Sequence, residues 1–138
     1  MHWLLIAILA ADLTAIRQEP NLERRSELAL ENADLSLSAA RSAYNSGDIE
    51  KTKSAIGEVQ ASVDLAYGSL TETGKDARRK PKFFKQAELT TRQLLRRIEG
   101  LRESMSYQDR QLLEAVQNRV SEVHEALLTG IMGKKPRK

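Results

Sequence analysis

The sequence predicts an all-α protein, an antiparallel up-down-up-down four-helix bundle that is made of two helical hairpins and preceded by an apolar N-terminal leader. Three observations predict this fold. Apolar residues recur at helical spacing along four stretches, and segments that contain Gly, Pro or Asn separate these stretches. No useful length of the chain alternates apolar and polar residues as a strand would. The 138 residues, 41% apolar and 30% charged, suit one globular domain.

The leader is an uncharged apolar run, WLLIAILAA, from Trp3 to Ala11. As a helix it would span about 14 Å, roughly half of a hydrocarbon core, so it is too short to cross a membrane unaided. Its length is typical of the apolar region of a secretory signal peptide, although the usual basic residues before it are absent. We therefore predict a signal peptide over residues 1–15, cleaved after Ala11 or Ala15. The other interpretation is an N-terminal helix that packs on the bundle.

The first predicted hairpin consists of helices over residues 21–45 and 49–70. Asn21 and Asp48 offer N-caps for the two helices, and Gly47 suits the left-handed residue that ends the first. The apolar band of the first helix is wide, because leucines flank its small-residue stripe on both sides. The expected core positions of the hairpin are Leu22, Leu28, Ala29, Leu30, Ala33, Leu35, Leu37, Ala40, Ala43, Tyr44, Ile49, Thr52, Ile56, Val59, Val63, Ala66, Tyr67 and Leu70.

The second predicted hairpin begins after a break over residues 71–81, in which Gly74 stops one helix and Pro81 starts the next. Its first helix covers residues 82–103. The break is long enough to act as a hinge, so the two hairpins could close within one chain or exchange between two chains. The expected core positions of the second hairpin are Phe84, Ala87, Thr91, Leu94, Leu95, Ile98, Leu101, Met105, Leu112, Leu113, Val116, Val120, Val123 and Leu127.

The fourth helix is expected to open at Ser106 almost without a loop. Ser106 to Asp109 resembles a capping box in which Asp replaces the usual Glu. The helix is expected to end at Gly130. The bundle domain is therefore predicted over residues 16–130, and a basic, disordered tail over residues 131–138.

The sequence predicts a non-enzymatic protein without a cofactor or a metal site. It contains no cysteine and only two histidines, His2 and His124, which excludes thiolate sites and multi-histidine metal catalysis. A di-iron bundle would need a Glu three residues before a ligand histidine, and Ser121 occupies that position before His124. The glycines inside the helices are isolated and form no phosphate-binding loop. We interpret His124 as a residue at the boundary of the core.

A basic segment is the clearest candidate for a functional surface. Residues 21–74 carry five basic and nine acidic side chains, whereas residues 75–105 carry ten basic and four acidic ones. The segment consists of Arg78, Arg79, Lys80, Lys82, Lys85, Arg92 and Arg96. The last four fall within about 80° on a helical wheel, opposite the apolar stripe, and form a cationic ridge. Glu88 and Glu99 partly neutralise the ridge, so a merely solvated face is the alternative.

Two functions are compatible with these features. The first is an exported, periplasmic or secreted module that serves a structural role or binds another protein or a second copy of itself. The alternative is a cytoplasmic module that binds anions or nucleic acid through the ridge and the KKPRK tail. Nucleic acid is the less favoured ligand, because no exposed aromatic residues are interleaved with the basic ones. If the leader is retained, it would hold the bundle only weakly on a membrane.

Overall fold

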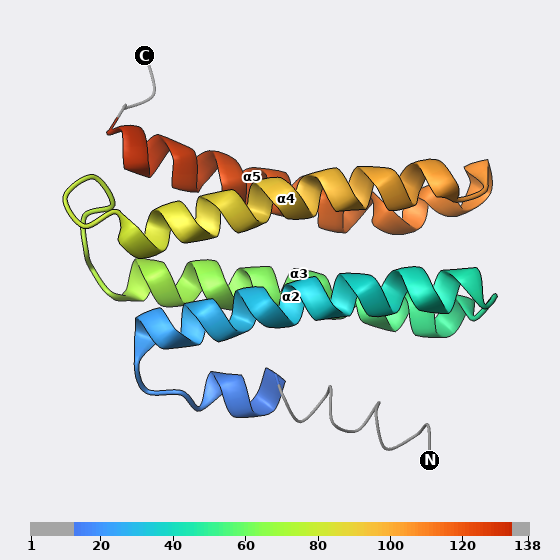
Figure 1. Ribbon diagram of the computed structural model, residues 1–138, viewed down its shortest axis with the longest axis horizontal. Coiled ribbons are helices and arrows are strands. Elements are labelled where there is room, and N and C mark those ends of the chain that lie inside the picture. Colours follow the sequence, from blue (N-terminus) through green and yellow to red (C-terminus); the bar gives the residue numbers. More distant parts are fainter. Residues whose placement is uncertain (1–12, 134–138) are drawn as a thin grey trace.

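The computed structural model describes residues 13–133, and their regular structure is entirely helical (Figure 1). No strand occurs between Leu13 and Gly133, which confirms the all-α prediction for this part of the chain. The predicted signal peptide falls mostly on residues 1–12, and the KKPRK tail on residues 134–138, both outside the described residues. The helices are α2 (Leu22–Asn45), α3 (Ile49–Glu72), α4 (Lys82–Ser104) and α5 (Glu114–Met132), with a 3-10 helix, η1 (Tyr107–Leu113), before α5.

The helices form two layers, with the α2–α3 hairpin packed on the α4–α5 hairpin (Figure 1). The chain reverses its direction at each connection (Figure 1). Across the two layers, however, α2 packs on α4 and α3 packs on α5, and both of these pairs run parallel. The reason is that the connection between α3 and α4 crosses from one corner of the bundle to the diagonal one. Ion pairs follow the same arrangement, joining Arg97 of α4 to Asp34 of α2 and Arg119 of α5 to Asp64 of α3.

One apolar core lies between the two layers, and all four long helices contribute to it. Most of the predicted core positions are buried, but Leu35 is wrong, since it is 60% exposed. Leu35 lies about 160° from the buried Ala33 around α2. Because α3 and α4 cover α2 from two sides, Leu35 falls on a side that neither of them covers. The largest fully buried side chains include Val59, Val63, Leu70, Leu94, Ile98, Leu101, Leu113, Val116, Val120, Val123 and Leu127.

The predicted caps of the first hairpin are confirmed. The Asn21 side chain accepts a hydrogen bond of 2.9 Å from the backbone N–H of Arg24. The Asp48 carboxylate accepts one of 3.0 Å from the backbone N–H of Lys51. Gly47, between the two helices, has a φ of 81°, where a side chain would be strained.

The start of the fourth helix differs from the prediction. Residues 107–113 form the 3-10 helix η1, and the α-helix begins only at Glu114. The Asp109 carboxylate accepts a hydrogen bond from the Ser106 hydroxyl, but it does not accept one from the backbone N–H of Ser106 as a capping box would. That N–H donates to the Tyr44 hydroxyl of α2 instead, at 3.0 Å, and this hydroxyl donates to Asp109 at 2.8 Å. The turn is thus bonded to the end of α2 as well as within itself.

The end of the fourth helix also lies beyond the predicted residue. α5 continues through Gly130 to Met132, and Gly133 ends it with a φ of 68°. The helix continues because Ile131 still packs against the core, so the apolar pattern outlasts the glycine that the sequence suggests as a stop.

The chain before α2 also contacts the bundle. Residues 13–17 are helical, Leu13 is only 6% exposed, and Ile16 packs against the core. Figure 1 shows this short segment beside the α2–α3 layer, on the side away from α4 and α5.

Candidate partner-binding surface

All seven basic residues singled out in the sequence are exposed. Arg78, Arg79 and Lys80 belong to the connection between α3 and α4, and Pro81 then leads into α4. Lys82, Lys85, Arg92 and Arg96 follow on α4, on the side turned away from the core. The structure therefore places the seven residues along the outer side of one helix and the loop that precedes it.

Arg92 is bound within the bundle. Its Nε and Nη2 atoms donate hydrogen bonds of 3.0 Å to the two carboxylate oxygens of Glu88, one turn earlier on α4. Nε2 of His124, on α5, lies 2.8 Å from the same carboxylate. The Arg92 guanidinium lowers the pKa of Glu88 below its ordinary value, burial opposes this, and the bond to His124 adds to the lowering. The charge of Arg92 is thus largely compensated.

Arg78 also has a structural contact. Its side chain lies directly against Gly133, where a Cβ atom would collide with it. Gly133 follows the last residue of α5, so the Arg78 guanidinium lies near the negative end of that helix. This contact joins the α3–α4 connection to the end of the chain that the structure describes.

The other five basic residues form no ion pair with any residue between Leu13 and Gly133. One of them, Lys82, has its Nζ atom 5.2 Å from the centre of the Phe83 ring. We call these five residues the open cations; they are Arg79, Lys80, Lys82, Lys85 and Arg96.

Leu89 lies among the cations of α4 and was missed by the sequence analysis. Its side chain is 46% exposed, so it adds apolar surface to a face that is otherwise basic. On the helical wheel it falls about 40° from Lys85 and about 20° from Arg96. The sequence could have predicted this position of Leu89, because residues 82, 85, 89, 92 and 96 follow one another at three- and four-residue spacing. We call these five residues the outer face of α4.

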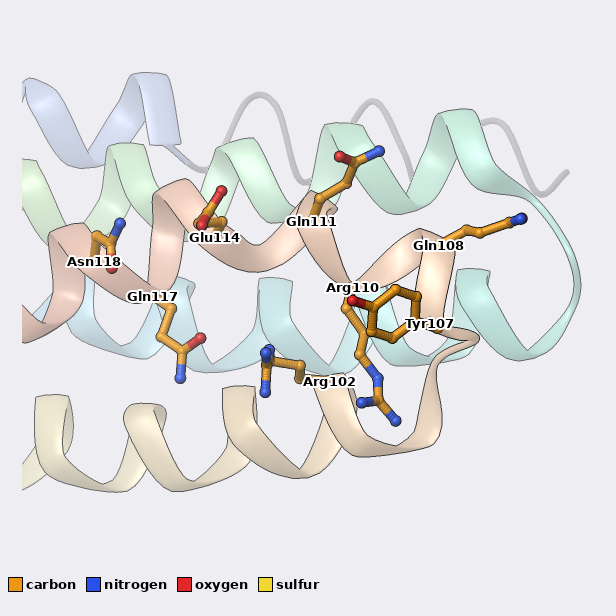
Figure 2. A pocket seen from close by; sticks show the side chains of 8 residues that line it. All are labelled: Arg102, Tyr107, Gln108, Arg110, Gln111, Glu114, Gln117 and Asn118. Atoms are coloured by element: carbon orange, nitrogen blue, oxygen red, sulfur yellow. The ribbon is translucent and has the colours of Figure 1, made fainter.

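A second surface feature lies at the opposite end of α4. A groove of about 540 Å³ runs between the end of α4, η1 and the start of α5 (Figure 2). Its lining includes Arg102, Tyr107, Arg110 and several amide side chains. This groove was not predicted from the sequence, because residues 107–113 were expected to belong to the fourth helix.

The described residues contain no group of three or more His, Asp or Glu side chains that could hold a metal ion. The histidine in this part of the chain, His124, is engaged with Glu88 as described above. Within the same range no helix has both the length and the apolar character needed to span a membrane. A scan with models of protein families and a search of curated proteins gave no match to this sequence.

Proposed function

We propose that this chain is a non-enzymatic, exported four-helix bundle that binds a protein partner with an acidic surface through the outer face of α4. One observation carries the proposal. An exposed leucine, Leu89, is surrounded by basic side chains, and the open cations among them form no ion pair within the described bundle. An apolar centre with a charged rim is the usual anatomy of a protein interface. The rim charges would speed association with an acidic surface.

Export is supported by the apolar run from Trp3 to Ala11, which has the length of a signal-peptide core. The absence of enzymatic activity is supported by the way in which several titratable groups are bonded between helices. Glu88 and His124 join α4 to α5, and Asp64 joins α3 to α5. Groups that are held in this way position the helices and are not free to act as an acid or a base.

The alternative is a cytoplasmic module that binds nucleic acid or another polyanion. The observation in its favour is the run of Arg79 and Lys80 in the loop, which continues the charge of Lys82 and Lys85 along α4. Each contact with a phosphate would release counterions, so binding would weaken steeply with added salt. Against it, Phe83 is half-buried, and the exposed Tyr107 lies at the other end of α4.

Site-specific crosslinking tests the first proposal. A photo-crosslinking amino acid replaces Gln93, an exposed residue of α4, in the full-length chain expressed in its source organism. We expect a protein adduct that disappears when Leu89→Ser or Lys85→Glu/Arg96→Glu is introduced. The matched control is Lys51→Glu/Lys53→Glu on α3, which makes the same change in net charge at two exposed lysines and should leave the adduct intact. An adduct that survives the α4 changes, or no adduct, would contradict the proposal.

Two further measurements separate the alternatives. Trp3 is the only tryptophan, so export with cleavage of the leader removes all indole fluorescence and lowers the mass of the chain. A full-length mass in an export-competent cell would contradict export. Binding of duplex DNA at low salt, lost in Lys85→Glu/Arg96→Glu and kept in Lys51→Glu/Lys53→Glu, would favour the nucleic-acid alternative.

A further inference from the structure

The turn η1 forms one side of the groove between α4 and α5, and it is held at both of its ends. The Tyr44 hydroxyl joins Ser106 and Asp109 on either side of the start of η1. Leu113, at the end of η1, is completely buried. Anchored at both ends, η1 holds Tyr107 outward with 86% of the residue exposed. An aromatic side chain that is held in solvent by an ordered turn is well placed to contact a ligand at low cost in conformational entropy.

Two arginine side chains line this groove. Figure 2 shows Arg102 of α4 and Arg110 of η1 extending into the space between α4 and α5, with Tyr107 beside Arg110. Arg110 forms no ion pair with a residue of the described chain, and its Nε atom donates one long hydrogen bond, 3.4 Å, to the carbonyl oxygen of Met105. Its remaining N–H groups are available, and a guanidinium matches the two oxygens of a carboxylate.

Glu99 contacts both Arg102 and the side-chain amide of Gln117. The Nη1 atom of Arg102 lies 3.6 Å from Oε2 of Glu99, and Oε1 of Glu99 accepts a hydrogen bond of 3.1 Å from the side-chain amide of Gln117. Glu99 thus contacts one arginine of α4 and one amide of α5, both of which line the groove. Its charge offsets part of the Arg102 charge, so Arg110 is the stronger site for an anion.

The rest of the lining suits a peptide. Gln108, Gln111, Gln117 and Asn118 contribute side-chain amides, and Glu114 is the one carboxylate among the lining residues. Each amide carries both a donor and an acceptor, as a peptide backbone does, whereas a phosphate would use donors only.

We propose that this groove binds an acidic peptide segment, with Arg110 and Arg102 holding a carboxylate, the amide side chains meeting the peptide backbone, and Tyr107 covering an apolar side chain. The proposal rests on the proposed function in one respect, since the segment would belong to the acidic protein partner. It names a second contact, separate from the outer face of α4.

The test is a titration of the ¹⁵N-labelled chain with the peptide acetyl-Glu-Leu-Glu-Leu-Glu-amide, followed by NMR. We expect the side-chain signals of Gln111, Gln117 and the Arg110 Nε to shift. Arg110→Gln should weaken binding by about five- to tenfold, and Arg102→Gln by about threefold. Glu114→Gln should strengthen it by about twofold, because the change removes a like charge. The opposite signs separate a charge effect from a loss of folding, which the same spectra would reveal.

Three controls can overturn the proposal. The neutral peptide acetyl-Gln-Leu-Gln-Leu-Gln-amide should bind at least about fivefold more weakly. Inorganic phosphate should cause smaller shifts at Gln111 and Gln117, and equal shifts would mean a general anion site rather than a peptide site. Lys82→Gln/Lys85→Gln should leave the titration unchanged. A loss of binding in this last variant, or no shift at the groove, would contradict the groove proposal, whereas the Gln93 crosslink tests the outer face of α4 independently.

Discussion

Nε2 of His124 on α5 lies 2.8 Å from a carboxylate oxygen of Glu88 on α4, and the two residues join the helices of the second hairpin. Glu88 is only 9% exposed, so its charge needs partners. Arg92 supplies the other two hydrogen bonds, each of 3.0 Å. Because Arg92 is bound in this way, it is the least available charge of the outer face of α4, and the open cations are better placed to meet a partner.

The stability of the bundle is expected to fall in acid through Glu88. Its pKa is lowered in the folded chain, first of all by the Arg92 hydrogen bonds. The folded state therefore binds the proton less readily than the unfolded state. The contribution of this carboxylate is fully present above its ordinary value of 4.5 and is lost as the pH falls through the lower, folded pKa.

Glu88→Gln tests this dependence. At pH 7 the free energy of unfolding of the variant should be about 1–2 kcal/mol lower than that of the unchanged chain, because the charge-assisted hydrogen bonds to Arg92 are lost. As the pH falls below the range in which Glu88 ionises, this difference should shrink. Urea unfolding monitored by circular dichroism between pH 2.5 and 7 measures it. Glu125→Gln is the matched control, since Glu125 is exposed and forms no ion pair within the described chain. A difference that does not change with pH would contradict the role of Glu88.

A buried amide is expected to hold the first hairpin in register. Asn32 of α2 donates hydrogen bonds of 2.9 Å to the Ser62 hydroxyl and 3.0 Å to the Glu58 carboxylate of α3. Asn32→Ala should cost about 2 kcal/mol, because it opens a small cavity and leaves the Ser62 hydroxyl without its partner. Ser62→Ala should lower the free energy of unfolding by about 1 kcal/mol less in the Asn32→Ala variant than in the unchanged chain. Denaturant unfolding of the four chains of this double-mutant cycle measures the coupling, and strictly additive losses would show that the pair is not coupled.

The sequence predicts the helices well because their apolar stripes are long and regular. The stripe of α4, from Phe84 to Met105, is buried almost as predicted. Leu35 is the exception. A helical wheel shows that the apolar band of α2 is wide, but it does not show how many neighbouring helices will cover that band. The parallel contact of α2 with α4 depends on the path of the connection over residues 73–81, and no periodic pattern records that path.

Two of the polar contacts between helices could have been predicted from the sequence. In an antiparallel hairpin, residues that are equally distant from the turn face each other. Asn32 and Ser62 are each 15 positions from Gly47, and Glu88 and His124 are each 18 positions from Ser106. The groove was not within reach, because it depends on η1 replacing the first turns of an α-helix. The start of η1 is also bonded to Tyr44, which is more than sixty positions away along the chain.

Loss of the Tyr44 hydroxyl is expected to loosen η1. Tyr44→Phe keeps the packed ring but leaves the backbone N–H of Ser106 and the Asp109 carboxylate without this partner. The free energy of unfolding should fall by about 1–2 kcal/mol, and amide hydrogen exchange in residues 107–113 should speed up. Tyr67→Phe is the control, because the Tyr67 hydroxyl forms no hydrogen bond to another described residue and its removal should change little. Equal effects of the two changes would mean that the Tyr44 hydroxyl does not order the turn.

If the chain is exported and the mature chain keeps the described fold, the contacts of residues 13–17 distinguish the two predicted cleavage points. Cleavage after Ala15 would remove Leu13, which is only 6% exposed, and would leave Ile16 at a charged N-terminus against the core. Cleavage after Ala11 would keep both contacts. We therefore expect the mature chain to begin at Asp12, as measured by mass spectrometry of the protein recovered from the exported fraction. Leu13→Asp should lower the stability of that mature chain by about 1–3 kcal/mol, because it places a charge at a buried position. A mature chain that begins at Ile16, or one whose stability is indifferent to Leu13→Asp, would show that these contacts are not part of the exported protein.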